Sequence, residues 1–324
     1  MKDKNVLLTG ATGFIGQWLL DKLVGLGSNV SVIVRNKKKS FFNSLKYDQT
    51  EIFYCDIRDY DSIIEIMKKN RFDFVFHLAS KNINYGTNFS LINTFDTIIK
   101  GTYNILDACR LHGENNLKII LTSSREVYAG DENNHSILKS YHPYEVSKKT
   151  VDLIVQSFCT KLGLSILSIR PPNIFGGGDL NWNRIIPGTM KSIINGEMPV
   201  IRTDGSLLRE YIYIEDFINT LILLAEKGFK KNIIGHVYDI DRLDAYSSLE
   251  IVNRIIDISR KKNIKPIIKN ISKDEKFDLF SQSENLINNL GWDTNYTIDS
   301  GLRKTWKWYK NYFNIVRTLG SKTW

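Results

Sequence analysis

Three glycines spaced three residues apart, Gly10, Gly13 and Gly16, most constrain what this chain can fold into. A short apolar run precedes them and predicts a buried strand, and apolar residues at helical spacing follow them. A strand, a glycine turn and a helix in this order form the context of a dinucleotide-binding fingerprint. Gly10 allows a tight turn, Gly13 lets the backbone approach a diphosphate, and Gly16 lets the helix pack closely on the strand. The unpaired N–H groups that begin such a helix favour the anionic diphosphate.

Further apolar runs continue this pattern through the first half of the chain. They predict strands at 29–34, 52–55, 74–80 and 117–122, with helical periodicity between them. Strands that alternate with helices indicate an α/β fold with a parallel sheet covered on both faces. Ligands of such sheets bind beyond the carboxyl ends of the strands. Residues at those ends are therefore candidate cofactor contacts.

The end of the second strand bears on the choice of dinucleotide. An acidic residue there would accept from the adenosine ribose hydroxyls and select NAD, but this chain has Val34, followed by Arg35 and the lysines 37–39. A guanidinium can clamp a 2′-phosphate, so the sequence favours NADP, with NAD as the alternative if Arg35 is simply exposed. Asp56, after the third strand, could meet the adenine amino group.

A second constellation follows the fifth strand. Ser124 lies in a Ser-Ser turn, and Tyr144 and Lys148 open a later helix, where residues four apart share a face. An ammonium near a phenol lowers the pKa of the phenol and makes it a base for a hydroxyl proton. The alternative is a coincidental Tyr and Lys on a surface helix. The predicted cofactor-binding residues are Gly10, Thr12, Gly13, Phe14, Ile15, Gly16, Arg35, Asp56, Ile57, Leu78, Ala79, Tyr144 and Lys148.

At this point nearly the whole chain resembles the extended short-chain dehydrogenase/reductase family, in its nucleotide-sugar epimerase/dehydratase branch. The resemblance depends on the glycine turn, on Ser124 four residues before Tyr128, and on Tyr144 with Lys148. It extends to the segments 170–176, 209–216 and 290–292, and residues 176–187 are similar to CDP-glucose 4,6-dehydratases. It implies a Rossmann-type doubly wound parallel sheet with a smaller C-terminal substrate-binding lobe.

The resemblance also implies residue roles. Ser124 would hydrogen-bond the reacting sugar hydroxyl, Tyr144 would be the base, and Lys148 would hold the nicotinamide ribose. Asn173 would contact the substrate diphosphate, and arginines would clamp phosphate or nucleotide, although Arg184 could equally be an exposed helix residue. The implied substrate-binding residues are Ser124, Arg125, Asn173, Arg184 and Arg209.

The residues after Ser124 bear on the reaction. Sugar 4,6-dehydratases of this family commonly carry Asp then Glu there; this chain keeps the base, Glu126, which we include among the catalytic residues, but has Arg125 in place of the acid. A guanidinium cannot donate a proton near neutral pH, so dehydration is in doubt, whereas epimerisation needs neither carboxylate. The leading hypothesis is an NAD(P)-dependent epimerase/dehydratase that forms a 4-keto sugar. A net NADPH-dependent keto-sugar reductase and a non-catalytic dinucleotide sensor are the alternatives.

Composition sets the remaining expectations. The net charge of +9 comes from scattered lysines without an arginine–aromatic stripe, so we expect a nucleotide-sugar substrate and no nucleic-acid partner. Three distant cysteines and the absence of long apolar runs favour a reducing, cytoplasmic location without membrane contact and without a metal site. We expect a dinucleotide-binding domain at 1–170 plus about 213–240 and a substrate lobe at 171–212 and 241–324. Family resemblance implies a homodimer built from the helices near 88–112 and 143–162.

Overall fold

The computed structural model describes residues 1–35, 50–81, 90–128, 142–229, 235, 237–240, 243–270 and 290–320, with side chains to 313 in the last helix. The chain divides into two compact units. One unit contains the described residues of Met1–Pro171, Ile218–Ile240 and Gln282–Trp292, and the other those of Pro172–Phe217, Asp241–Ser281 and Asp293–Trp324. The boundary near Phe217 falls inside a helix, so a continuous element connects the two units.

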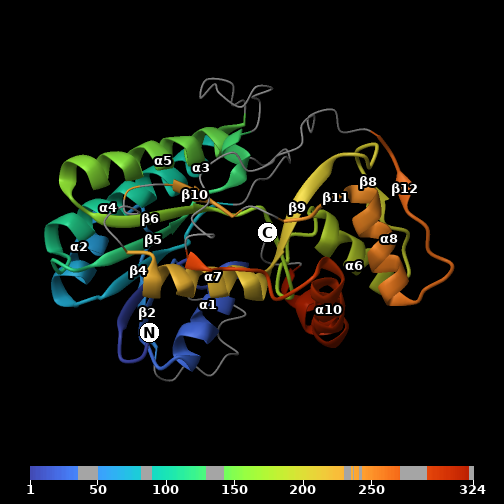
Figure 1. The fold of residues 1–324 in the computed structure, drawn as a ribbon, viewed down its shortest axis with the longest axis horizontal. Helices are drawn as coiled ribbons and strands as arrows, with labels where there is room; N and C mark the ends of the chain where they lie inside the picture. Colours follow the sequence, from blue (N-terminus) through green and yellow to red (C-terminus); the bar gives the residue numbers. More distant parts are fainter. Residues whose placement is uncertain are drawn as a thin grey trace. The chain divides into compact units, whose positions relative to one another are not determined.

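A seven-stranded parallel sheet forms the centre of the first unit (Figure 1). Its strands are β1 (Asn5–Thr9), β2 (Asn29–Val34), β3 (Glu51–Tyr54), β4 (Phe74–His77), β5 (Lys118–Thr122), β6 (Ser165–Arg170) and β10 (Val237–Asp239). They lie in the order β10-β6-β5-β4-β1-β2-β3, and every neighbouring pair is parallel. The order reverses between β1 and β4, where doubly wound sheets bind their ligands. The predicted α/β fold with a Rossmann-type parallel sheet is confirmed.

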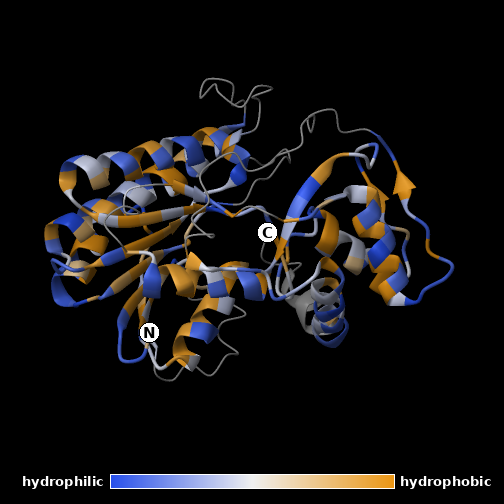
Figure 2. Ribbon diagram, in the orientation of Figure 1, coloured by the Kyte–Doolittle hydropathy of each residue, from blue (hydrophilic) through white to orange (hydrophobic). Residues whose placement is uncertain are grey.

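Helices cover the sheet because their apolar residues repeat at helical spacing. They are α1 (Phe14–Gly25), α2 (Tyr60–Lys69), α3 (Leu91–Phe95), α4 (Gly101–His112), α5 (Pro143–Leu162) and α7 (Ile214–Lys227). One buried cluster joins α2, α4 and α5 to the strands through Ile63, Ile105 and Val151, which pack with Leu7 and Val75. The strands are mostly hydrophobic and the helices alternate in hydropathy (Figure 2), as burial of both sheet faces requires.

The helix expected near 88–112 is interrupted. A π-helical turn, Asp96–Lys100, separates α3 from α4. α4 then begins at Gly101, where a Cβ atom would lie 2.4 Å from Cδ1 of Ile57. Glycine at this position lets the helix approach the residue that follows β3.

The described residues of the second unit form two small sheets and three helices besides the start of α7. Its strands are β7 (Asn173–Phe175), β8 (Val200–Ile201), β9 (Leu208–Tyr213), β11 (Ala245–Ser247) and β12 (Ile267–Ile268), and its helices are α6 (Ile185–Asn195), α8 (Ser248–Ser259) and α10 (Ile298–Gly320). The sheets have the orders β11-β9-β7 and β12-β8. Tyr309 of α10 is fully buried, and its ring lies 5.9 Å from that of Trp182. Tyr309 thus packs in the core of this unit.

None of the helices in the described part of the chain combines the length and the apolar character that a membrane span requires.

Candidate functional site

The glycine turn after β1 has the geometry of a diphosphate cradle. Gly10 has φ +75°, and a Cβ atom there would lie 2.6 Å from the backbone nitrogen of Ala79. At Gly16 a Cβ atom would lie 2.1 Å from the Gly10 carbonyl oxygen. Gly13 is the N-cap of α1 and supplies no side chain to the first N–H groups, and the first turn of α1 has no acidic residue. The free N–H groups and the helix dipole therefore suit an anionic diphosphate.

The other predicted cofactor contacts lie at the ends of neighbouring strands. Arg35 is exposed directly after β2, whereas lysines 37–39 lie outside the described residues. Asp56, after β3, accepts hydrogen bonds from Arg58 Nε at 3.0 Å and Nη2 at 2.8 Å, and this contact lowers the pKa of Asp56. Ala79, after β4, donates its N–H to Thr9 Oγ1 at 3.1 Å. Because these strands are adjacent and parallel, their ends meet at one edge of the sheet.

Ser124 lies between β5, which ends at Thr122, and a short 3₁₀ helix, η3 (Arg125–Tyr128). Its hydroxyl oxygen accepts the N–H of Glu126 at 3.2 Å. Accepting this bond fixes the oxygen while leaving the hydroxyl proton available to donate to a ligand. Arg125 is only 3% exposed, and Glu126 is half-buried.

Tyr144 and Lys148 lie one turn apart at the beginning of α5. The Lys148 Nζ is 5.8 Å from the centroid of the Tyr144 ring, and it donates a hydrogen bond to the Thr122 carbonyl oxygen at 2.9 Å. This bond ties α5 to the end of β5, two residues before Ser124. Burial lowers the pKa of Lys148 to about 8, and Asp152 opposes the decrease.

The start of α5 is fixed by its own capping residues. The His142 Nδ1 accepts the N–H of Tyr144 at 3.2 Å, and Glu145 Oε2 accepts the N–H of His142 at 3.2 Å. Pro143 occupies the first helical position. Tyr144 therefore lies in the first turn, where the helix dipole stabilises a phenolate in addition to the ammonium of Lys148. Sequence reasoning overlooked this capping box, although Glu145 follows His142 at the expected spacing.

His77, at the end of β4, is a buried structural residue. Its Nδ1 lies 2.7 Å from Thr9 Oγ1 and its Nε2 lies 3.1 Å from Thr102 Oγ1. Burial, with a smaller effect of Lys148, lowers its pKa to about 3. The described residues contain no group of His, Cys, Asp and Glu side chains able to hold a metal ion.

The second unit holds the other predicted substrate contacts. Asn173 of β7 is exposed and pairs in register with Tyr211 of β9, two residues after Arg209. Arg209 in turn pairs with Tyr246 of β11. Side chains two residues apart on a strand share a face, so Asn173, Arg209 and Tyr246 project from one face of this small sheet. Arg209 Nη1 donates to the Leu208 carbonyl oxygen at 2.9 Å.

Arg184 immediately precedes α6 and is 47% exposed at its side chain. Its Nη1 lies 3.2 Å from Oδ2 of Asp179, which is almost fully buried. One nitrogen of the guanidinium is thus bonded within the protein, and the role of Arg184 in binding a substrate stays a prediction.

A buried polar network beside Lys148 also escaped the sequence analysis. Asp152, one turn after Lys148, accepts hydrogen bonds from Arg170 at the end of β6. Arg170 donates to the Tyr128 hydroxyl, which donates to Asp239 of β10. The only sequence signal was the four-residue spacing of Lys148 and Asp152.

Comparisons with known proteins identify the family of this chain. Residues 6–240 match the NAD dependent epimerase/dehydratase family, and the chain belongs to that family. A dTDP-D-glucose 4,6-dehydratase of Dictyostelium discoideum is 26% identical, over 98% of this chain and 84% of the relative.

Two further relatives extend the comparison. A trifunctional UDP-glucose 4,6-dehydratase/UDP-4-keto-6-deoxy-D-glucose 3,5-epimerase/UDP-4-keto-L-rhamnose-reductase of Arabidopsis thaliana is 25% identical over 95% of this chain, and the chain spans only 47% of that relative. Among solved structures, UDP-N-acetylglucosamine 4-epimerase from Methanobrevibacter ruminantium, in complex with UDP-N-acetylmuramic acid, has a TM-score of 0.81 and 25% identity. That alignment covers 96% of this chain and 99% of the epimerase. The chain is therefore similar, over nearly its whole length, to nucleotide-sugar dehydratases and epimerases.

Proposed function

We propose that this enzyme oxidises C4 of a nucleotide-diphosphate sugar, transforms the resulting 4-keto sugar and reduces it again. The observation that carries the proposal is the Tyr144–Lys148 pair, with Lys148 Nζ 5.8 Å from the Tyr144 ring and bonded to the Thr122 carbonyl at the end of β5. The cradle around Gly10 and Gly16 supports a dinucleotide in the same unit. A bound nicotinamide dinucleotide supplies a hydride acceptor and donor for C4.

The side chains of this chain would handle the protons. Tyr144, as phenolate, takes the proton of the C4 hydroxyl, because Lys148 and the start of α5 stabilise its negative charge. Ser124 donates a hydrogen bond to the same substrate oxygen. Asn173 and Arg209 are proposed to hold the diphosphate. Guanidinium and amide donors suit its oxygens.

Arg125 favours epimerisation as the fate of the 4-keto sugar. Elimination of water needs a neutral acid to protonate the leaving hydroxyl, and a guanidinium cannot serve as one. Arg125 is 3% exposed and lies between Ser124 and Glu126, where an acid would be needed. Epimerisation needs only a turned ketone and return of the hydride to the other face. Glu126 would abstract a proton only in a reaction that enolises the ketone at a neighbouring carbon, and inversion at C4 does not need that step.

The test is incubation of the purified enzyme with UDP-, dTDP- and CDP-linked hexoses that carry deuterium at C4. Products are followed by mass spectrometry and proton NMR, and the nicotinamide by absorbance. We expect a product of unchanged mass with inverted C4, deuterium kept, and no net change in the nicotinamide. Tyr144→Phe should lower the rate by about 10²-fold or more. Tyr312→Phe, which alters an exposed tyrosine of α10, is the matched control.

Other outcomes of this experiment would identify one of the alternative functions. Loss of one water from the product would show a dehydratase despite Arg125. Stoichiometric consumption of NADPH would show a reductase. Dinucleotide binding without turnover of any sugar, unaffected by Tyr144→Phe, would refute the enzymatic proposal and favour a sensor.

We further propose that the dinucleotide is NADP. Arg35 is exposed at the end of β2 and lies close enough to Asp56 to lower the pKa of that carboxyl. No carboxylate ends β2, because the strand closes with Val34. A guanidinium here can bind a 2′-phosphate, and an acidic residue that would repel one is absent from this strand end.

Calorimetric titration with NADP⁺ and NAD⁺ tests this assignment. Arg35→Ala should weaken NADP⁺ binding by about tenfold, the loss of one charge-assisted contact, and leave NAD⁺ binding unchanged. Arg71→Ala, which removes an exposed arginine paired with Glu114, is the control. Equal affinity for both dinucleotides in the wild type and the variant would exclude NADP selection by Arg35.

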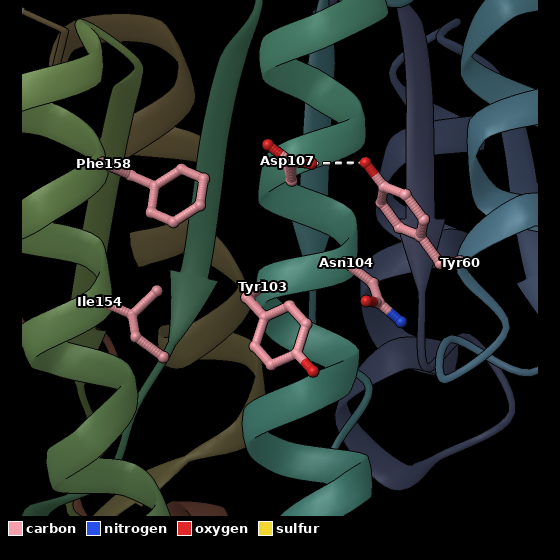
Figure 3. A pocket seen from close by; sticks show the side chains of 6 residues that line it. All are labelled: Tyr60, Tyr103, Asn104, Asp107, Ile154 and Phe158. Atoms are coloured by element: carbon pink, nitrogen blue, oxygen red, sulfur yellow. Dashed lines mark hydrogen bonds between the residues drawn. The ribbon is translucent and has the colours of Figure 1, made fainter.

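We propose a homodimer formed through α4 and α5. Tyr103, Asp107 and Leu111 form a stripe on α4, and Ile154 and Phe158 begin a matching stripe on α5. Tyr103 and Leu111 are 40% and 47% exposed. A pocket of about 570 Å³ is lined by residues of α4 and α5 and by Tyr60 of α2. Figure 3 shows these side chains, among which Asp107 accepts a hydrogen bond from Tyr60. Two such faces related by a twofold axis would form a four-helix bundle and cover both stripes.

Light scattering after size exclusion measures the oligomeric state. Leu162 lies one turn after Phe158 on α5 and is exposed like Leu111. Leu111→Glu combined with Leu162→Glu should convert dimers to monomers, because each replaces an exposed leucine of the proposed interface by a charge. Tyr312→Lys, which charges an exposed aromatic residue on α10, should leave the dimer intact. A monomeric wild type at micromolar concentration would refute the dimer.

We also propose a reducing, cytoplasmic location. Cys55, Cys109 and Cys159 are all free thiols, and free thiols persist in reducing compartments. Thiol alkylation in intact cells before lysis should label the more accessible Cys55 and Cys159. Their recovery as disulfides would contradict the assignment.

A further inference from the structure

Three polar side chains recur at four-residue intervals on α5: Tyr144, Lys148 and Asp152. Residues at this spacing share one face of a helix. Asp152 is 4% exposed, and its Oδ2 accepts hydrogen bonds from Arg170 Nε at 2.8 Å and Nη2 at 2.7 Å. The catalytic role proposed above for Tyr144 and Lys148 does not use this carboxylate. Burying an ion pair costs desolvation free energy, so the position of this pair next to Lys148 needs a physical explanation.

The ion pair continues toward the segment that bears Ser124. Arg170 Nη1 donates to the Tyr128 hydroxyl at 2.7 Å, and its guanidinium carbon lies 5.1 Å from the centroid of the Tyr128 ring. Tyr128 donates in turn to Asp239 Oδ2 at 2.7 Å. Tyr128 ends η3, which begins directly after Ser124. The network therefore connects α5 to η3 through the ends of β6 and β10.

We propose that Asp152 is a positioning residue for the Tyr144–Lys148 pair: its carboxylate holds Lys148 as an ammonium ion and, through Arg170 and Tyr128, anchors the Ser124 segment against α5. The inference rests on the proposed function, because only there do these side chains act together on a sugar hydroxyl. The inference adds two roles that Tyr144 and Lys148 do not themselves provide. Asp152 sets the charge of Lys148, and Arg170 with Tyr128 anchors the segment that bears Ser124.

The surroundings of Lys148 explain why a counter-charge is needed. Its side chain is 5% exposed, and among the described residues the groups that face it are the Tyr144 ring, the Thr122 carbonyl, the neutral His77 and Asp152. Burial lowers the pKa of Lys148 to about 8, and Asp152 is the carboxylate that opposes this decrease. Without it, the amine would lose its proton closer to neutral pH and stop stabilising the phenolate.

The positive charge of Arg170 favours the ionised form of Asp152. Burial raises the pKa of Asp152, and the positive charges of Arg170 and Lys148 oppose that rise. A guanidinium does not lose its proton in proteins, so a neutral Asp152 would take from Arg170 the carboxylate that accepts two of its hydrogen bonds. The arginine thus secures the negative charge that the lysine needs.

The test is ¹³C NMR titration of the full-length protein labelled at lysine Cε, with the Lys148 signal identified by its absence from Lys148→Met. Asp152→Asn should lower the titration midpoint of Lys148 by about one pH unit or more, as expected for unit charges about one helical turn apart. Asp152→Glu should restore it. Tyr128→Phe, which keeps both charges, should leave it unchanged. Tyr128→Phe should still lower kcat for hydride transfer, because η3 loses its tie to Arg170.

A second variant protects the test against misfolding. Asp152→Asn combined with Arg170→Gln removes both members of the ion pair, so Arg170 is not left without its carboxylate, and it should lower the Lys148 midpoint in the same direction by a smaller amount. An unchanged Lys148 midpoint in Asp152→Asn and in the double variant would overturn the role of Asp152 in setting the charge of Lys148. A full kcat in Tyr128→Phe would overturn its role in anchoring η3. Because the titration needs no turnover, a shifted midpoint in a protein inactive on every sugar nucleotide would refute the proposed function alone.

Discussion

The buried His77 provides a quantitative test of the structure through the pH dependence of stability. Thr102 Oγ1 donates to the Ile98 carbonyl at 2.6 Å, so it accepts from His77 Nε2–H. Ala79 donates its N–H to Thr9 Oγ1, so the Thr9 hydroxyl proton is free to donate to His77 Nδ1. The hydrogen bonds run in one direction through a neutral imidazole protonated at Nε2. A second proton at Nδ1 would leave the Thr9 hydroxyl proton without its acceptor.

The sign and size of the effect follow from the pKa of His77 in the two states. The pKa is 6.5 when unfolded and about 3 when folded, so the unfolded chain binds the proton more tightly. The contribution to stability is fully present above pH 6.5 and is lost as the pH falls toward 3. A tenfold change in proton affinity corresponds to about 1.4 kcal/mol, so the whole contribution has an upper limit of about 5 kcal/mol. Between pH 7 and pH 5, about 2 kcal/mol should be lost.

Urea unfolding at pH 7 and pH 5, followed by circular dichroism, measures this loss against His77→Gln. The variant cannot titrate at this position, so the wild type should lose about 2 kcal/mol more than the variant between the two pH values. His112→Asn, which alters a half-buried histidine at the end of α4, should behave like the wild type. Imidazole NMR of the wild type should report a neutral Nε2–H tautomer at pH 5. Parallel pH dependence of the wild type and His77→Gln, or a charged imidazole at pH 5, would refute the reasoning.

Three substitutions test other parts of the structure. Gly16→Ala places a Cβ atom 2.1 Å from the Gly10 carbonyl oxygen, so it should weaken dinucleotide binding at least tenfold in a fluorescence titration, whereas Gly25→Ala, with open space around its Cβ, should not. Gly177→Ala places a Cβ atom 2.3 Å from the Trp308 ring, and it should destabilise the protein by about 1–3 kcal/mol in urea unfolding. Asp216→Ala removes the acceptor of the Asn295 and Tyr296 N–H groups, and it should increase hydrogen exchange of those two amides; unchanged exchange would contradict the contact.

Much of the fold follows from local patterns in the sequence. The glycine spacing, the alternation of apolar strands with helical periodicity, and the Tyr144–Lys148 interval predict the parallel sheet and the pair on α5. The sequence predicts these elements because the periodicity of side chains in strands and helices is set by residues close together in the chain. The π-helical turn before Gly101 was not predicted. A regular α-helix and an α-helix with one residue inserted as a π turn have nearly the same pattern of apolar residues, so the sequence does not distinguish them.

The sequence alone determined that this chain forms an α/β dinucleotide fold, and it placed a tyrosine and a lysine one helical turn apart. The tertiary structure decided what surrounds that pair. Lys148 meets the Thr122 carbonyl because β5 ends beside α5. Asp152 meets Arg170, Arg170 meets Tyr128, and Tyr128 meets Asp239, because β5, β6 and β10 are neighbours in the sheet. These contacts join residues up to 111 positions apart. No local period encodes them: strand order and burial fix which charges meet, and burial then sets how strongly they interact.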